Sequence, residues 1–148
     1  MSIQTPAVAV PEVGSAVPAW VVESVSAEKM KTMAALLDDS NPIHFDVEVL
    51  RALGMGDRPV NQGPSNLGYV QNMLMAWAGP RSLRRLRLRF LTNVHAGDRV
   101  VASGTVTAVR HEAGAILVDC DVQLTIEDAG TALTGTATVE WPSQEDPS

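Results

Sequence analysis

The spacing of apolar residues changes once along this 148-residue chain, near Ser82. Before that point, residues 65–78 carry apolar side chains at helical spacing, and Gly79 and Pro80 end the pattern. After it, apolar and polar residues alternate in four segments, which predicts strands joined by short turns. A helix this apolar must be buried against one face of that sheet. The sequence therefore predicts an α+β fold with one long helix and an antiparallel sheet.

Further elements are expected before the long helix. Ser26 is a suitable cap for a helix whose apolar face would hold Met30, Met33, Ala34 and Leu37. Asp46 is a suitable cap for a short helix that ends near Leu53. The expected strands are residues 19–25, 82–90, 100–109, 116–126 and 132–141. We expect residues 1–18 to form a loosely ordered arm, residues 19–141 one domain, and residues 142–148 a flexible acidic tail.

The composition restricts the class of protein. Hydrophobic residues make up 45% of the chain and charged residues 19%, which is enough for a folded core. The net charge of −6 argues against nucleic acids and anionic membranes as partners. No apolar run reaches the roughly 18 residues of a membrane span. The first 13 residues lack a basic side chain, so we expect neither a secretory signal nor a transit peptide, and a cytoplasmic protein.

One six-residue stretch combines a carboxylate, an amide and an imidazole around a proline: Asp39-Ser40-Asn41-Pro42-Ile43-His44. The proline prevents an uninterrupted helix and pushes the preceding residue out of the helical region. The side chains of Asp39 and His44 can therefore converge across a bend and hold one water for its addition or removal. The same residue types also form ordinary turns between helices. Spacing alone leaves both interpretations open.

This stretch resembles the signature of the MaoC-like R-specific enoyl-CoA hydratases and 3-hydroxyacyl dehydratases: Asp, any residue, Asn, Pro, an aliphatic residue, His. Residues 58–63 resemble the family's second landmark, the start of its long central helix, with Gln62 where a His is usual. Pro64 follows where a Met is usual. The resemblance covers about residues 20–141. It implies a single hot-dog fold, in which a five-stranded antiparallel sheet wraps the long helix, and pairing into dimers.

The resemblance also implies an activity, the syn addition of one water to a 2-enoyl thioester or the reverse dehydration. It identifies Asp39 and His44 as the catalytic pair. Asn41 would support the pair by hydrogen bonds within the bend, and a role as turn former is at least as open as a direct catalytic role. Gly63 would offer a backbone N–H to the thioester oxygen, since free donors at a helix start favour negative charge. Gly63 could equally serve only a tight turn.

Expectations for substrate binding rest on fewer signals. Gln62 and Leu67 are candidates for contact with the substrate. Five arginines lie close together in an otherwise acidic chain: Arg81, Arg84, Arg85, Arg87 and Arg89. Of these, Arg85, Arg87 and Arg89 share one strand face, which is either a dock for the phosphates of CoA or of a carrier-protein pantetheine, or a solvated or interface face. We expect no metal and no cofactor, because the histidines and Cys120 lack metal-ligand spacing.

Two functions of different kinds remain. The first is an enoyl-CoA hydratase or 3-hydroxyacyl dehydratase that acts on an acyl-CoA thioester. The second is a subunit that shapes the acyl tunnel of a partner hydratase, or a non-catalytic protein that binds acyl thioesters. Residues 60–89 resemble the branch that acts on long-chain or steroid side-chain acyl groups. The partner would be a second copy or a related hot-dog subunit, and because Asp39 and His44 are both present, this chain would be the active partner.

Overall fold

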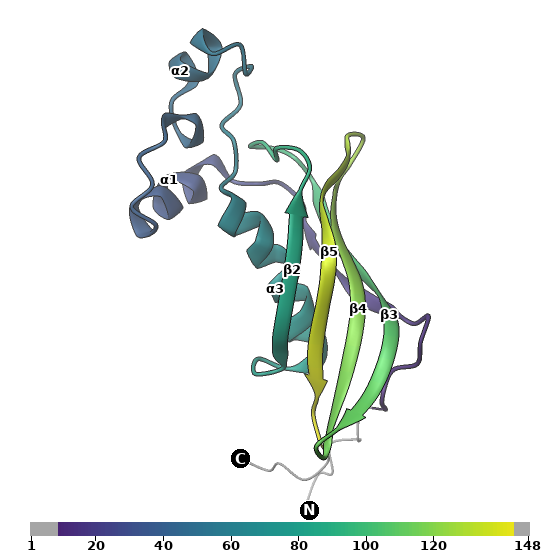
Figure 1. Cartoon of the computed structure of the whole chain (residues 1–148). Helices are drawn as coiled ribbons and strands as arrows, with labels where there is room; N and C mark the ends of the chain where they lie inside the picture. The colour runs from purple at the N-terminus through teal and green to yellow at the C-terminus, as the bar shows by residue number, and fades with distance from the viewer. Residues whose placement is uncertain (1–8, 144–148) are drawn as a thin grey trace, which may run out of the picture.

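The computed structural model describes residues 9–143, and these form a five-stranded antiparallel sheet that wraps one long helix (Figure 1). The spatial order of the strands is β1-β3-β4-β5-β2. The elements are β1 (Ala16–Val22), α1 (Ala27–Leu36), the 3₁₀ helix η1 (Pro42–His44), α2 (Val47–Ala52), α3 (Gly63–Ala78), β2 (Leu83–Phe90), β3 (Val100–Glu112), β4 (Ala115–Ile126) and β5 (Gly130–Trp141). The predicted α+β class and the hot-dog arrangement are confirmed.

The core lies between α3 and the concave face of the sheet. Pro64 occupies the first turn of α3, where its missing N–H is not needed, and Gly79 ends the helix at φ 106°. The helix buries Val70, Met73 and Leu74, and burial of each such side chain contributes roughly 1.5–3 kcal/mol. Near its end, Trp77 meets Trp141 edge to face, with ring centroids 5.0 Å apart. The helix is thus fixed along its length.

Two details of the sequence prediction were wrong. The first strand is Ala16–Val22 rather than residues 19–25, because Val17 pairs with Gly104 and a bulge separates it from Trp20. The arm expected at 1–18 therefore ends before Ala16; its residues 1–8, like residues 144–148 of the tail, lie outside the described range.

The buried faces of α1 and α3 also differ from those that the spacing of apolar residues predicts. Leu67 is only half-buried, and the polar Asn66 is buried in α3 instead. Leu37, the C-cap of α1, is 42% exposed, and within α1 only Met30 is fully buried. The spacing was right, but α1 lies beyond the end of the sheet, where there is less surface to pack against.

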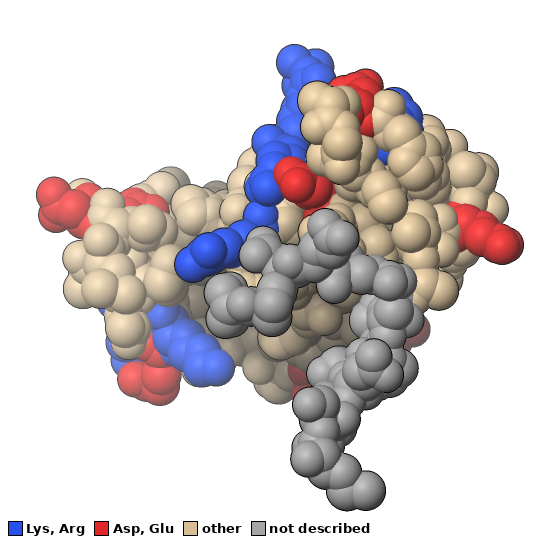
Figure 2. Space-filling view, turned by 90° about the horizontal axis from the view of Figure 1, so that it is seen from below, with Lys and Arg blue, Asp and Glu red and all other residues tan. Residues whose placement is uncertain are grey.

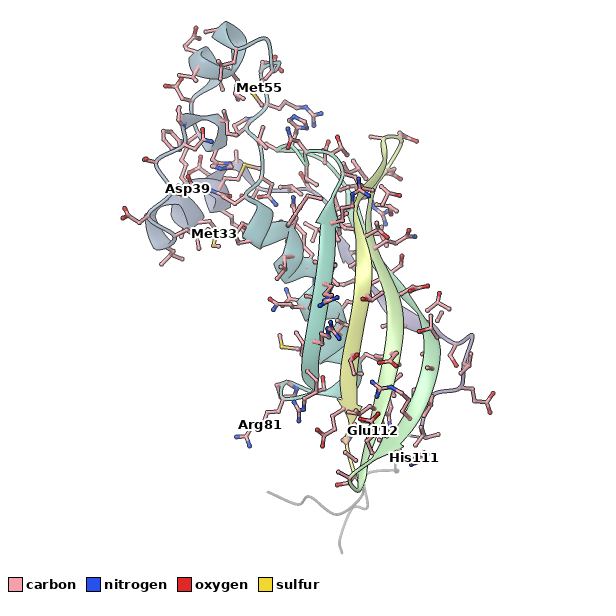
Figure 3. All side chains as sticks on the ribbon, viewed as in Figure 1. Met33, Asp39, Met55, Arg81, His111 and Glu112 are labelled. Atoms are coloured by element: carbon pink, nitrogen blue, oxygen red, sulfur yellow. The ribbon has the colours of Figure 1, made fainter. Side chains whose placement is uncertain are left out.

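A helical lobe, residues 26–54 with α1, η1 and α2, projects beyond the amino end of α3 (Figure 1). Figure 3 shows Asp39 in this lobe, whereas Arg81, His111 and Glu112 lie at the opposite end of the molecule. No helix in residues 9–143 has both the length and the apolar character needed to cross a membrane.

The backbones of β5 and β2 approach each other closely at Gly135. This residue pairs with Val122 on β4 and with Leu88 on the edge strand β2. A Cβ atom at Gly135 would lie 1.8 Å from the carbonyl oxygen of Arg87. Any side chain would therefore force β2 away from β5.

We expect Gly135→Ala to lower the free energy of unfolding by about 3 kcal/mol, because β2 must move to admit the methyl group. Gly68→Ala is the matched control, since a Cβ there meets no atom within 4 Å. In the interior of α3 it should be neutral or stabilising by up to about 1 kcal/mol. Urea unfolding of both variants measures the difference, and equal stabilities would contradict the close contact.

Candidate active site

The end of α1 determines where Asp39 lies. Leu37 caps the helix, and Asp38 follows in the left-handed conformation at φ 51°. The N–H of Asp38 donates to Ala35 O at 3.4 Å, and that of Asp39 donates to Ala34 O at 2.9 Å. These two bonds form a Schellman motif, with Asp38 in the place usually taken by glycine. Asp39 is therefore held by the last turn of a helix rather than by a free loop.

The bend after Asp39 is closed by side chains of the motif itself. Asp39 Oδ1 accepts a hydrogen bond from the Asn41 N–H at 3.0 Å. Asn41 Oδ1 in turn accepts from the Ile43 N–H at 3.3 Å and caps η1, which Pro42 begins. Asn41 thus has the structural role in the bend that the sequence predicted, and a direct catalytic role stays a prediction.

The bend brings the carboxylate and the imidazole together. His44 Nε2 lies 3.2 Å from Asp39 Oδ2. The His44 side chain is 8% exposed, whereas that of Asp39 is 34% exposed, so the carboxylate is open to solvent and the imidazole is not. The expected convergence of these two side chains is present. Their catalytic roles stay a prediction.

The other ring nitrogen of His44 identifies the tautomer. Nδ1 lies 2.6 Å from the carbonyl oxygen of Val60, which can only accept a hydrogen bond. Nδ1 therefore carries a hydrogen, and Nε2 is the nitrogen that can exchange a proton. Because Nε2 faces Asp39, the pair can take a proton from a water and pass it on within one site.

The amino end of α3 lies close to this pair along the chain. Gly63, the first residue of α3, follows Val60 by three residues, or at most about 10 Å of chain. Its N–H has no acceptor among the described residues, and the 16-residue helix adds a positive end. A Cβ on Gly63 would lie 3.6 Å from the ring of Phe90. The site can therefore offer a backbone donor to a negatively charged oxygen.

Gln62 and Leu67, the expected contacts with substrate, have different surroundings. Gln62 is 1% exposed, and its Nε2 donates to Met30 O at 2.8 Å, which joins α3 to α1. Its Oε1 is buried without a hydrogen-bond partner. Leu67 is half-buried one helical turn after Gly63, on the same face of α3. For both residues, substrate contact stays a prediction.

The arginine-rich strand β2 is an edge of the sheet. Leu86 and Leu88 pack against the core, so the alternate positions lie on the outer face, away from α3. Three exposed arginines there have no partner among the described residues: Arg85, Arg87 and Arg89. Their neighbour Arg84 does have one, since it pairs with Glu140 at 2.7 Å. Figure 2 shows basic side chains in a continuous band on the face seen from below. Phosphate binding by Arg85, Arg87 and Arg89 stays a prediction.

Two groups of residues near the pair were not found by sequence reasoning. A 270 Å³ pocket between α1 and α3 is lined in part by Asn61 and Tyr69. Asn61 Nδ2 donates to Asn66 Oδ1 at 2.7 Å and to the Tyr69 hydroxyl at 3.2 Å. Asp98 forms the second group with Arg58, whose Nη1 lies 2.7 Å from Asp98 Oδ1. Burial of Asp98 opposes ionisation, but Arg58 and the His95 N–H outweigh it and lower the pKa of Asp98.

The described residues contain no cluster of three or more metal-ligating side chains. Cys120 is buried in β4, and burial raises the pKa of its thiol to about 12. It is a packing residue of the sheet.

Comparison with known proteins gives one family and several related structures. The description of the matching family is "MaoC like domain", and the match covers residues 10–127. The (R)-hydratase from A. caviae involved in PHA biosynthesis is 26% identical, with a TM-score of 0.79 over 89% of this chain and 98% of that one. No curated protein sequence matches significantly.

Two further structures show the same fold. A chain of the ChsH1–ChsH2 complex from Mycobacterium tuberculosis is 24% identical, with a TM-score of 0.77 over 90% of this chain and 100% of that one. The R-hydratase PhaJ1 from Pseudomonas aeruginosa is 18% identical, with a TM-score of 0.78 over 90% of this chain and 84% of that one.

The lowered pKa of Asp98 predicts a pH dependence of stability. The stabilisation by ionised Asp98 is complete above the unfolded value of 3.8 and is lost as the pH falls through the lower folded value. At pH 6 we expect wild type to unfold at a higher urea midpoint than Asp98→Asn. The difference between the two midpoints should become smaller below about pH 4. A gap that stays constant from pH 6 to pH 2.5 would contradict the role of this charge.

Proposed function

Because this chain belongs to the MaoC-like domain family, we propose that it is an R-specific 2-enoyl-CoA hydratase, or a 3-hydroxyacyl dehydratase in the reverse direction. The observation that carries the proposal is the 3.2 Å contact between His44 Nε2 and Asp39 Oδ2, with the carboxylate open to solvent. The similarity to the A. caviae (R)-hydratase supports it.

In the proposed reaction, Asp39 accepts a proton from the bound water as the water oxygen bonds to the β-carbon. His44 Nε2 holds and orients the same water. The pair then returns one proton to the α-carbon on the same face, so that the elements of one water are added and none is left over. The Gly63 N–H stabilises the thioester oxygen while it carries enolate charge, and such a donor is typically worth roughly 10²–10³ in rate.

The acyl group would lie along exposed apolar side chains near the pair. Phe45 directly follows His44 and is 41% exposed. Phe90, beside Gly63, is 52% exposed. Leu67 would extend this apolar surface along α3, and Gln62 would support the surface from its buried side. A CoA thioester substrate would place the protein in the cytoplasm.

A dimer partner is the second part of the proposal, and β2 is the edge that would receive it. The other edge strand, β1, contains Pro18 and a bulge, both of which hinder pairing with another strand. Two copies joined antiparallel through β2 would place Arg85, Arg87 and Arg89 of each on one face. Like charges opposite each other in a sheet are destabilising.

We therefore propose a related hot-dog subunit with carboxylates on its edge strand as the partner, rather than a second copy. The match to the ChsH1–ChsH2 complex supports a pair of unlike subunits. The alternative function follows from the same observation: within such a pair, this chain would shape the acyl tunnel for a long-chain or steroid side-chain substrate, or would bind the acyl thioester without catalysis.

We expect Asp39→Asn to lower the rate of hydration of a 2-enoyl-CoA by about 10²–10⁴, because an amide cannot accept the proton of water. Loss of the conjugated-thioester absorbance measures the rate. Asp38→Asn is the matched control, since Asn tolerates the left-handed conformation and Asp38 makes no contact with His44. No turnover of short, long or polycyclic enoyl-CoA by wild type, alone or with its partner, would exclude the hydratase and favour the non-catalytic alternative.

The charge on β2 predicts how the chain associates. A triple variant with Arg85→Glu, Arg87→Glu and Arg89→Glu supplies an acidic edge on the same fold. At about 10 mM salt, where charges are felt over roughly 30 Å, we expect an equimolar mixture with wild type to dimerise more tightly than either protein alone. Sedimentation velocity measures this, and the advantage should disappear near 1 M salt. A wild-type homodimer that is equally stable at both salt concentrations would contradict an acidic partner.

A further inference from the structure

The geometry of His44 depends on one residue outside the motif, Val60. The Val60 N–H donates to Ile43 O at 2.9 Å, and the Val60 carbonyl accepts from His44 Nδ1 at 2.6 Å. Val60 is 3% exposed, so water cannot replace these bonds. The position of the Val60 backbone therefore determines both the orientation and the tautomer of the imidazole.

Val60 is itself held by the segment before β3. It forms an isolated β-bridge with His95. On either side of the bridge, the Ala96 N–H donates to Pro59 O at 2.9 Å, and the Asn61 N–H donates to Val94 O at 2.7 Å. Residues 59–61 thus lie between the catalytic motif on one side and residues 94–96 on the other.

Asp98 joins this segment to its neighbour through both carboxylate oxygens. Oδ2 accepts from the His95 N–H at 2.8 Å and closes the turn at residues 95–98. Oδ1 accepts from Arg58 Nη1 at 2.7 Å, and the same nitrogen donates to Ala96 O at 3.0 Å. The side chain of Asp98 is only 12% exposed, which strengthens these charged hydrogen bonds.

The turn is also attached to the core. The Val25 N–H donates to Asp98 O at 2.9 Å, and the Gly97 N–H donates to Val25 O at 2.8 Å. Val25 is 3% exposed and packs in the main hydrophobic cluster. Asp98 is therefore fixed at its backbone by the core and at its carboxylate by the segment that carries Val60.

We propose that Asp98 is a positioning residue for His44, with Arg58 as the link between them. Together they hold the Val60 carbonyl where it keeps a hydrogen on Nδ1 of His44 and turns Nε2 towards Asp39. Neither residue touches the pair. The catalytic consequence rests on the proposed hydratase function, whereas the effect on the imidazole does not.

Two substitutions interrupt this link from opposite sides. In Asp98→Asn, the amide oxygen can still accept from the His95 N–H, while the amide NH₂ faces the guanidinium of Arg58, donor against donor. Arg58→Met removes the guanidinium and leaves the turn at residues 95–98 intact. Arg58→Lys restores the charge and one donor. Glu23→Gln is the control, because it removes an exposed ion pair with Arg99 at 2.9 Å, and neither of these side chains bonds to residues 58–61.

Steady-state kinetics on a 2-enoyl-CoA give the first readout. We expect Asp98→Asn and Arg58→Met to lower kcat by about 10–100-fold, the range found when a metal-bound histidine loses the group that orients it. KM should stay within about 2-fold, since substrate contacts remain. Arg58→Lys should recover part of kcat, and Glu23→Gln should match wild type.

The ¹⁵N chemical shifts of His44 give a second readout that does not need activity. The chain has three histidines, and the signal lost in His44→Gln assigns the one of interest. Wild type should show the Nδ1–H tautomer, and the two link variants a mixture of tautomers. If wild type has no hydratase activity, the proposed function fails, while the shifts still decide the positioning role.

A purely structural role for Asp98 predicts a different result. The link variants would then lose stability but retain wild-type kcat per folded molecule and the Nδ1–H tautomer, and this outcome would overturn the proposal. If Asp98→Asn does not fold, Arg58→Met provides both readouts by itself, because it leaves the turn at residues 95–98 in place.

Discussion

The hydrogen bond between His44 Nδ1 and the Val60 carbonyl joins the two parts of this molecule. On one side lies the helical lobe, whose last turn of α1 holds Asp39. On the other lies the body, in which α3 is packed into the sheet and Val60 is three residues from its start. Without this contact, the imidazole of His44 would have no hydrogen bond to the body of the molecule. With it, the Asp39 carboxylate and the His44 imidazole are held in a fixed position relative to the amino end of α3.

Burial is divided unequally between the two members of the pair. His44 is enclosed and bonded to a carbonyl, which fixes its tautomer, while Asp39 is partly open to solvent. A group that must exchange a proton with water needs access, and a group that must orient the water needs rigidity. The structure provides each property in a different side chain. Two large apolar side chains are also exposed, Phe45 directly after His44 and Phe90 beside Gly63.

The local parts of this arrangement could be predicted from the sequence, and the long-range parts could not. Gly79 and Pro80 end α3 by their own backbone preferences, and Pro42 bends the motif, so both features follow from neighbouring residues. The start of β1 at Ala16 depends on pairing with β3, which no local pattern reveals. Val60 acts only through its backbone, so its residue type carries no signal. Asp98 and Arg58 are 40 positions apart and look like ordinary surface charges in the sequence.

A hydrogen bond from Gln62 holds the helical lobe against the start of α3. The carbonyl of Met30 can only accept, so the NH₂ of Gln62 must face it, and Oε1 is left buried without a donor. An unsatisfied buried oxygen costs about 1–3 kcal/mol, which a methionine of similar shape would avoid. The amide, however, forms a directional hydrogen bond. It joins the residue before Gly63 to the middle of α1, the helix that precedes Asp39. This bond therefore ties the helix that ends at the proposed proton acceptor to the residue before the proposed oxyanion donor, through a side chain that bonds to neither.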